Sequence, residues 1–523
     1  MNDLIMWVRR NYCVMILGLL VTIGLILRVC ACWWGAPYQL HPDEGTIVKN
    51  AIDMISRGSY IAEVYNRPDH FEIKCCALLF QIVSYIKFHI SADVAFAEHT
   101  MLFYLVARLY TVFWGTLTIF LAYKMTEKIK CDAKCLAAGF VSFFPVFVKN
   151  SAYATPDIVL TFFVLLIAYL SIFYLEKFEN KFLIGICVAT GIGITIKYTC
   201  AISCIWIAIL VCIDCFKRRK YFEILKKGVF CIVIVLGVSF LIAPNLYINI
   251  SETISILRFE SRSMHLGSDG LGFLGNLSFY FNVFLENVGY EVFGFFVVGV
   301  AFCKKNKKAM SMLLGVLFLI FTSTLALHWE RWGMPIYIFC AIISALGISY
   351  LYDLSVERKW LKYAVYIIGS LILMNLLLSS ILVVQRKLTT EANVDAIQFC
   401  KENGITEKNT LYDGYTPFQL NYPGTILVKI KESGELDVDN NIEYLMISAL
   451  MYERYYAEPE RYQDIVNMYD SIQDNCELIY EAGGDYYEHS NFAIVNIVKA
   501  IQGLILHDEN TITGYMIKIY EIS

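Results

Sequence analysis

Long apolar stretches separated by short polar ones occupy the chain up to about residue 385. A helix that crosses a bilayer needs roughly 20 mainly apolar residues. Stretches of this kind are centred near residues 22, 115, 142, 166, 189, 206, 238, 290, 318, 343 and 372. The pattern therefore predicts about eleven membrane-spanning helices. No small-residue cleavage pattern follows the first stretch, so we expect it to remain as an anchor.

After about residue 385 the pattern changes to that of a small α/β domain. Alternating or β-branched segments predict strands at 425–430, 444–448, 478–481 and 516–522, and helical patterns occur near 394–403 and 458–469. We therefore expect an all-α polytopic membrane domain over residues 1–385 and a small α/β domain over residues 386–523.

Basic residues recur in every second loop, which predicts the orientation of the chain. They cluster at 124–134, 177–181, 217–220, 304–308 and 358–362, whereas the loops 33–107, 149–157, 249–275 and 328–334 hold fewer per length. Short cytoplasmic loops carry the excess of Lys and Arg. We therefore expect a multi-pass protein of the plasma (inner) membrane, with a cytoplasmic N-terminus and an extracytoplasmic C-terminal domain.

The composition is typical of a membrane protein and argues against a nucleic-acid partner. Of 523 residues, 58% are hydrophobic and only 17% charged, which is unlike a soluble domain. A net charge of -4 without a recognisable nucleic-acid module predicts no nucleic-acid partner. Most cysteines lie in apolar runs and none has a convincing metal-ligand spacing, so we expect no metal and no cofactor. Cys400 and Cys476 share the C-terminal domain, where a bridge between them is one alternative.

Two adjacent acids follow the first apolar stretch, in the sequence His41-Pro42-Asp43-Glu44-Gly45. Ionisable groups beside hydrocarbon are costly and are usually kept for function. A carboxylate there can act as the base that deprotonates a nucleophile. The alternative is a loop that caps the next helix, with Pro42 at its first turn and Asp43 near the positive end of the helix dipole.

Further motifs follow this acidic pair in a specific order. They are the stretch from Ala51 to Gly58, Lys74 about thirty residues after the pair, Ala107-Arg108-Leu109, Ala154-Thr155-Pro156-Asp157, Gly193 to Tyr198, and Arg331-Trp332-Gly333-Met334-Pro335. Over roughly residues 15–350 the chain resembles the membrane-embedded C-type glycosyltransferases. It is most similar to the branch of protein O-mannosyltransferases and lipid A aminoarabinose transferases.

The resemblance implies transfer of a sugar, with inversion, from a polyprenyl-phosphate donor to an extracytoplasmic lipid, glycan or protein acceptor. Asp43 would be the general base, with Glu44 beside it. The leaving phosphate needs cations, for which Lys74, Arg331 and Lys197 are the candidates. Residues expected to contact substrate are Asp157, Glu72, His265 and Arg262. Lys74 departs from the family pattern, because relatives often read Glu-Lys-Pro and this chain reads Glu72-Ile73-Lys74-Cys75.

Other interpretations remain open on the residues alone. Lys197 and Arg331 lie at predicted helix ends, where basic side chains commonly extend to the membrane interface. A multi-spanning transporter or lipid flippase would place its charges at mid-bilayer on broken helices, whereas these candidates cluster on one outer side. A carbohydrate-polymer ligase or polymerase would share the lipid donor without the early Pro-Asp-Glu loop. The sequence favours the transferase.

Overall fold

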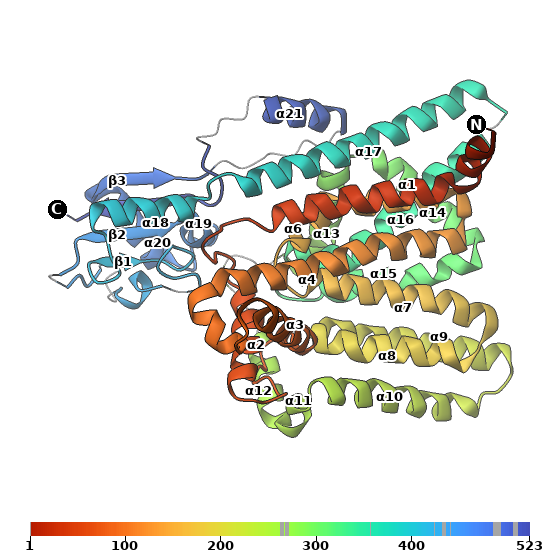
Figure 1. Ribbon diagram of the computed structural model, residues 1–523, viewed down its shortest axis with the longest axis horizontal. Coiled ribbons are helices and arrows are strands. Elements are labelled where there is room, and N and C mark those ends of the chain that lie inside the picture. Colours follow the sequence, from red (N-terminus) through yellow and green to blue (C-terminus); the bar gives the residue numbers. More distant parts are fainter. Residues whose placement is uncertain are drawn as a thin grey trace.

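The computed structural model describes residues 2–261, 266, 271–355, 357–422, 424–430, 436–439, 441–484, 493–505 and 511–522. Most of them form a bundle of long helices that lie side by side, with the C-terminal domain at one end (Figure 1). The helices of the bundle are α1 (Asn2–Ala31), α4 (Ala92–Ile129), α5 (Lys134–Phe143), α6 (Pro145–Ser151), α7 (Asp157–Lys177), α8 (Asn180–Ile196), α9 (Ser203–Lys217), α10 (Glu223–Ile242), α13 (Gly272–Val288), α14 (Glu291–Lys305), α15 (Leu313–Ser323), α16 (Met334–Leu354) and α17 (Lys359–Leu388).

The chain is an integral membrane protein, but the expected number of spans is not confirmed. Within the described residues, seven helices are long and apolar enough to cross a membrane, or up to nine if each bent pair counts as one span. All eleven predicted centres fall in helices or at the break of a bent pair, but α8 has only 17 residues and α15 only 11. The count of about eleven is therefore not confirmed, because hydropathy does not show where one helix ends and the next begins.

Helices α5 and α6 meet at an angle of 54°. Pro145 begins α6 and has no N–H to donate to the carbonyl of Val141 one turn earlier. The buried Arg28 of α1 donates instead, from Nη2 to Val141 O at 3.0 Å and from Nη1 to Ser142 O at 3.0 Å. Backbone carbonyls released inside a membrane need such partners, so this side chain makes the break tolerable.

Two helices of the long loop after α1 cover the end of the bundle that faces the C-terminal domain (Figure 1). They are α2 (Glu44–Ser56) and α3 (His70–Phe88), joined by an extended segment. The apolar side of α2 is buried through Ile47, Ala51 and Met54, as expected for the amphipathic stretch. The extended segment is fixed to α11 (Asn245–Ile248), because Asn245 Nδ2 donates to Ala62 O at 2.7 Å. The adjoining helix is α12 (Ile250–Glu260).

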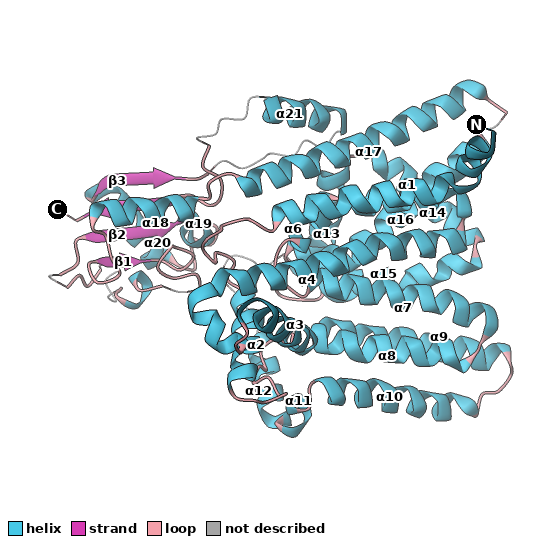
Figure 2. Ribbon diagram, viewed as in Figure 1, coloured by secondary structure: helices cyan, strands magenta, loops and turns pink. Residues whose placement is uncertain are grey.

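The C-terminal domain contains a four-stranded sheet of order β1-β2-β4-β3, which lies at one end of the molecule (Figure 2). Its strands are β1 (Thr410–Tyr412), β2 (Tyr444–Ser448), β3 (Glu477–Ala482) and β4 (Ile517–Glu521). Only the β1–β2 pair is parallel. The helices are α18 (Ala392–Asn403), α19 (Ala449–Tyr456), α20 (Gln463–Asn475) and α21 (Ala493–Ile505). The expected α/β domain is therefore present.

One predicted strand is wrong. Residues 425–430 contain a short 3-10 helix, Ile426–Val428, instead of a strand. The side chain of Thr425 accepts the N–H of Tyr412 at 2.9 Å, and its own N–H donates to Tyr412 O at 2.7 Å. These two hydrogen bonds attach Thr425 to the end of β1, and the chain then enters the 3-10 helix instead of continuing as a strand. The sequence also missed α21, an apolar helix that packs on α17 near Leu382 and Gly503.

Candidate active site

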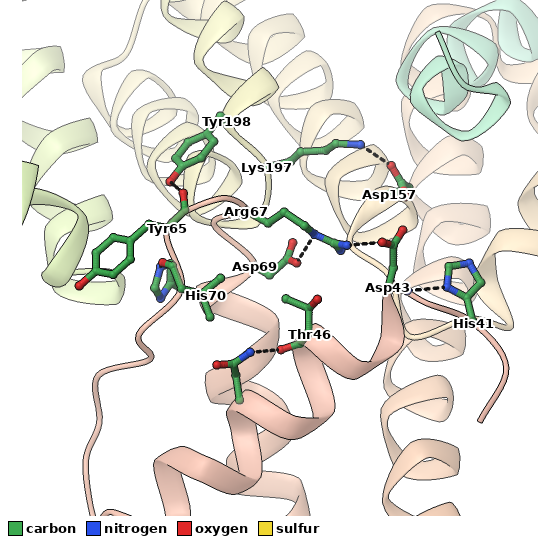
Figure 3. Close-up of polar contacts among 12 residues, drawn as sticks. His41, Asp43, Thr46, Tyr65, Arg67, Asp69, His70, Asp157, Lys197 and Tyr198 are labelled. Atoms are coloured by element: carbon green, nitrogen blue, oxygen red, sulfur yellow. Dashed lines mark hydrogen bonds and ion pairs between the residues drawn. The ribbon is translucent and has the colours of Figure 1, made fainter. Parts of the chain in front are cut away.

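Asp43 lies between two arginines at the end of the bundle near the C-terminal domain. Its Oδ1 is 2.6 Å from Arg67 Nη1, and its Oδ2 is 2.7 Å from Arg331 Nη2. Arg67 also binds Asp69, with Nε 2.8 Å from Oδ2 (Figure 3). Asp43 is the N-cap residue of α2, but its side chain makes no capping hydrogen bond. Asp43 therefore lies at the helix start, as the alternative interpretation expected, but its carboxylate pairs with the two arginines instead of capping the helix.

Arg331 also lies near Asp157 at the start of α7, and Asp157 in turn binds Lys197 at the end of α8. Asp157 Oδ2 lies 3.7 Å from Arg331 Nε, and Asp157 Oδ1 accepts from Lys197 Nζ at 2.7 Å. Lys197 lies 5.0 Å from the centre of the Trp332 ring, a cation–π distance. Asp43, Arg331, Asp157 and Lys197, all expected from the sequence, are thus brought together in one site.

Five segments distant in sequence build this site, and each contributes from a helix boundary; Asp43 precedes α2, and Arg67 and Asp69 precede α3. Asp157 is the first residue of α7, which follows Pro156. Lys197 follows α8 in an extended conformation that separates α8 from α9. Arg331 belongs to the short helix η4 (Glu330–Gly333) before α16. The charged side chains therefore gather where helices end, and three acids face three cations with no net charge.

Glu44 turns away from Asp43 and is completely buried. Its two oxygens accept from Arg108 Nε at 2.8 Å and Nη2 at 2.7 Å, and Oε1 also accepts from the N–H of Ala154 at 2.9 Å. Arg108 Nη1 in turn donates to the carbonyls of Cys32 and Trp34. This clamp joins the end of α1, the start of α2, α4 and the loop before α7. Glu44 therefore fixes the backbone that carries Asp43.

The charges around Asp43 determine its protonation. Burial alone would raise the pKa of its carboxyl, but the neighbouring Arg67 and Arg331 outweigh that effect and hold the pKa well below its usual range. Asp43 is therefore ionised and, in this arrangement, a weak proton acceptor. Burial lowers the pKa of the adjacent His41 to about 4, so His41 is neutral near pH 7. Its Nδ1 accepts from the N–H of Asp43 at 3.2 Å.

Of the four remaining site candidates, Glu72 and Lys74 lie within the described residues. Glu72 on α3 is buried and neither carboxylate oxygen has a hydrogen-bond partner among the described residues; its pKa is raised well above the usual value, first by burial and then by Asp69. Lys74, two residues further along α3, makes no ion pair among the described residues. Arg262 and His265 lie outside the described residues.

Arg67 and Asp69 are site residues to which the sequence analysis assigned no role. A signal was present, because Arg67-Pro68-Asp69 lies in the same outer loop as Asp43. What the sequence did not show is that the loop folds back and is held by Tyr198, whose hydroxyl donates to Tyr65 O at 2.9 Å (Figure 3). Arg108 was quoted only as part of a motif, and its pairing with Glu44 was not foreseen.

No group of three or more His, Cys, Asp or Glu side chains suited to a metal ion occurs within the described part of the chain. The carboxylates of Asp43, Asp69 and Asp157 are each already paired with a cation. Metal-independent transfer remains a prediction of the sequence. Cys400 and Cys476 are both free thiols.

Comparisons with known proteins support the resemblance seen in the sequence. The family model for dolichyl-phosphate-mannose-protein mannosyltransferases matches residues 101–248. No curated protein sequence matches the chain. The resemblance to membrane-embedded C-type glycosyltransferases is thereby confirmed for this part of the chain.

Similar solved structures extend the comparison to the fold. The oligosaccharyltransferase of Archaeoglobus fulgidus, in complex with Zn and sulfate, is 13% identical, with a TM-score of 0.54, over 92% of this chain and 73% of that one. ArnT from Cupriavidus metallidurans bound to undecaprenyl phosphate is 12% identical, with a TM-score of 0.48, over 86% and 95% of the two chains. At these identities the likeness concerns fold alone. The chain has the predicted C-type glycosyltransferase fold, as in the oligosaccharyltransferase.

Proposed function

We propose that this protein is a glycosyltransferase that moves a sugar from a polyprenyl-phosphate donor to an acceptor outside the cytoplasm, with inversion. The observation that carries the proposal is the Asp43 carboxylate, 24% exposed, between Arg67 and Arg331 at one end of the helical bundle. The partial match to the mannosyltransferase family and the C-type fold support the same reaction class.

The reaction needs a base and a stabilised leaving group. In the proposed step the acceptor hydroxyl gives its proton to an Asp43 oxygen, and the acceptor oxygen forms a bond to the anomeric carbon. The bond between that carbon and the phosphate oxygen breaks, and its electron pair stays on the phosphate. Attack from the face opposite the phosphate inverts the anomeric centre, and polyprenyl phosphate leaves.

The arginines explain how a weakly basic Asp43 could act as the base. Arg331 holds the carboxylate of Asp43 when no other anion is present. A donor phosphate that binds Arg331 and Lys197 would compete for the same guanidinium, which would raise the pKa of Asp43 toward its ordinary value. Under this proposal Asp43 gains basicity when the donor arrives.

Other residues receive roles that follow from their positions. Lys74 is available to an anion because it makes no ion pair among the described residues. Asp157 holds Lys197 in place at 2.7 Å. Glu72, with unpartnered oxygens, is proposed to bind a sugar hydroxyl. For Arg262 and His265 substrate contact remains a proposal from the sequence.

The transporter or flippase alternative fits the site less well. Transporters usually place functional charges near the middle of the membrane on interrupted helices. Here Asp43, Asp157 and Arg331 lie at or before helix starts, and Lys197 lies just after a helix end. A reaction at the membrane surface accounts for that placement.

The test compares cell-envelope lipids and glycans by mass spectrometry in cells that carry the wild type, Asp43→Asn or Asp53→Asn. Asp53 is a matched control, because it lies on α2 but pairs with the exposed Arg57 away from the site. We expect the sugar-modified acceptor to fall by about three orders of magnitude with Asp43→Asn, while polyprenyl-phosphate sugar accumulates. Asp53→Asn should leave both species unchanged.

An undiminished level of modified acceptor in Asp43→Asn cells, with equal amounts of protein in the membrane, would remove Asp43 from the mechanism. Loss of donor lipid from the outer leaflet in Asp43→Asn cells would instead support the flippase.

A further inference from the structure

A cavity of about 500 Å³, lined by apolar and polar side chains, lies where the membrane helices meet the C-terminal domain. Its lining includes Trp34 just after α1, Tyr153 after α6 and Lys387 near the end of α17. The loop before β4 contributes Thr513 and Gly514. The cavity is therefore closed partly by the C-terminal domain, for which the proposed reaction has so far supplied no role.

Lys387 is the unusual group in this cavity. Its side chain is 6% exposed, and Nζ has no hydrogen-bond partner among the described residues. Nζ lies 3.5 Å from the centre of the Tyr153 ring and 5.2 Å from that of Trp34. Cation–π contacts offset part of the cost of burying an ammonium group, but an unpaired buried charge stays unfavourable. Its N–H groups are therefore available to an anion.

The other charges of the cavity do not neutralise Lys387. The lining contains three cations, Lys149, Arg386 and Lys387, and two carboxylates, Glu286 and Glu330. Lys149 is already paired with Glu330 at 2.9 Å. Basic side chains outnumber carboxylates in the lining, and a ligand with a negative group would supply the partner that Lys387 lacks.

The aromatic residues indicate what else the ligand contains. Trp34 and Tyr153 meet edge to face, with ring centres 5.2 Å apart. Their apolar surfaces lie beside polar groups of Asn287 and Thr513. Pockets that combine apolar walls with a few convergent polar groups suit a ligand that has both kinds of surface. A saturated ring with hydroxyl groups has C–H faces for the aromatic rings and hydroxyls for the polar groups.

The rings of Tyr153 and His41 lie between the cavity, whose lining does not include Asp43, and the candidate active site. The ring of Tyr153, in the cavity wall, lies 4.5 Å from that of His41. His41 Nδ1 in turn accepts the N–H of Asp43. Glu330 of the cavity immediately precedes Arg331, which binds Asp43. A ligand in the cavity would therefore be a near neighbour of the proposed base.

We propose that this cavity is the acceptor site and that it binds a sugar-like ring carrying a negative group, which Lys387 holds while Trp34 and Tyr153 contact the ring. The inference rests on the proposed function, because only a transferase requires an acceptor next to Asp43. It assigns a purpose to the C-terminal domain, which completes the wall through Thr513 and Gly514.

The test measures binding without turnover by the full-length protein. The probes are inositol 1-phosphate in solution, nanodiscs that contain phosphatidylinositol, and uncharged inositol. The variants are Lys387→Met, Lys387→Arg, and Lys49→Met as a control on the exposed side of α2. We expect the wild type to bind a charged probe, and Lys387→Met to weaken that binding about ten- to hundred-fold. Lys387→Arg should retain it, as should Lys49→Met.

The two charged probes distinguish a soluble acceptor from one carried by a lipid, and binding of either supports the proposal. Asp43→Asn should bind the probe as the wild type does, so a failed transfer reaction and a failed acceptor site remain distinguishable. Equal binding of uncharged inositol would overturn the proposal, as would wild-type affinity in Lys387→Met. Loss of polyprenyl-phosphate binding in Lys387→Met would show that the cavity serves the donor instead.

Discussion

Asp43 and Glu44 are adjacent in sequence but have different environments. Successive residues at a helix start point about 100° apart, so Asp43 faces Arg67 and Arg331 while Glu44 faces Arg108. The sequence presented them as one acidic pair. Only the tertiary structure separates a partly exposed carboxylate from one that is fully buried.

We expect Glu44→Gln to act on stability and Asp43→Asn to act on transfer. The Glu44 change leaves Arg108 buried without a counter-charge, which costs about 3–5 kcal/mol when one partner of a buried pair is removed. Thermal unfolding in detergent should therefore show a lower midpoint for Glu44→Gln than for Asp43→Asn. Equal midpoints, together with equal loss of transfer, would mean that Glu44 takes part in the reaction.

Asp413 in the C-terminal domain provides a pH-dependent readout. It is fully buried, and burial raises the pKa of its carboxyl from 3.8 to about 8, although Tyr469 and the N–H of Ser448 donate to it. The folded domain thus binds a proton that the unfolded chain has already lost near pH 6. The contribution of Asp413 to the free energy of unfolding is therefore fully present below about pH 4 and is lost as the pH rises toward about 8.

We expect hydrogen exchange of the β2 amides to quicken between pH 4 and pH 8, beyond the intrinsic effect of pH. Asp413→Asn should remove this additional dependence, since the amide does not titrate. A control such as Asp437→Asn, on the surface of the same domain, should keep it. The same excess slope in Asp413→Asn would contradict the assignment.

At the scale of the elements, the break between α5 and α6 depends on α1 and α17. Arg28 supplies donors to Val141 and Ser142, and the hydroxyl of Ser380 donates to Phe143 O at 2.8 Å. Pro145 predicts a break in the helix. The residues that make the break tolerable lie more than 100 positions away in sequence, so no local pattern could indicate them.

We expect Arg28→Met to destabilise the bundle by about 1–3 kcal/mol for each carbonyl left without a partner. Replacing Pro145 by Ala restores an N–H that can donate to Val141, so the double variant should lose less stability than Arg28→Met alone. A double-mutant cycle based on thermal unfolding measures this coupling. Additive losses would show that Arg28 acts elsewhere.

The predicted strands and membrane spans differ in how well they agree with the structure. The segments 444–448, 478–481 and 516–522 agree with β2, β3 and β4, because alternation reports a half-buried face directly. Residues 425–430 have a similar composition, but after Thr425 bonds to Tyr412 of β1 the chain enters a 3-10 helix. The apolar run from 182 to 216 reads as two tight spans, and the extended Lys197 divides it into α8 and α9.

At the scale of the whole molecule, the two ends of the bundle differ. The N-terminus and the turn between α16 and α17 lie at one end, while α2, α12 and the C-terminal domain lie at the other (Figure 1). Basic residues at 217–220 and 304–308 predict which end is cytoplasmic. The proposed transfer to an acceptor outside the cytoplasm requires the second end to face outward.

We expect a reporter fused after residue 220 or 306 to be cytoplasmic and one fused after residue 400 to be extracytoplasmic. The positive-inside rule gives this direction. A pair of reporters, one active only outside and one only inside, provides the internal control. A cytoplasmic signal after residue 400 would place the proposed site on the wrong side of the membrane.

Patterns along the chain predicted the membrane class, the change to an α/β domain near residue 385, the C-type resemblance, and four charged residues of the candidate site: Asp43, Asp157, Lys197 and Arg331. Hydrophobic patterning and helix-boundary motifs are local, so they can be read from neighbouring residues. The tertiary structure alone decided the pairing of Asp43 with Arg67, the clamp of Glu44 by Arg108, and the cavity around Lys387. Those features depend on side chains brought together from distant segments, and contact across such separations leaves no periodic trace in one sequence.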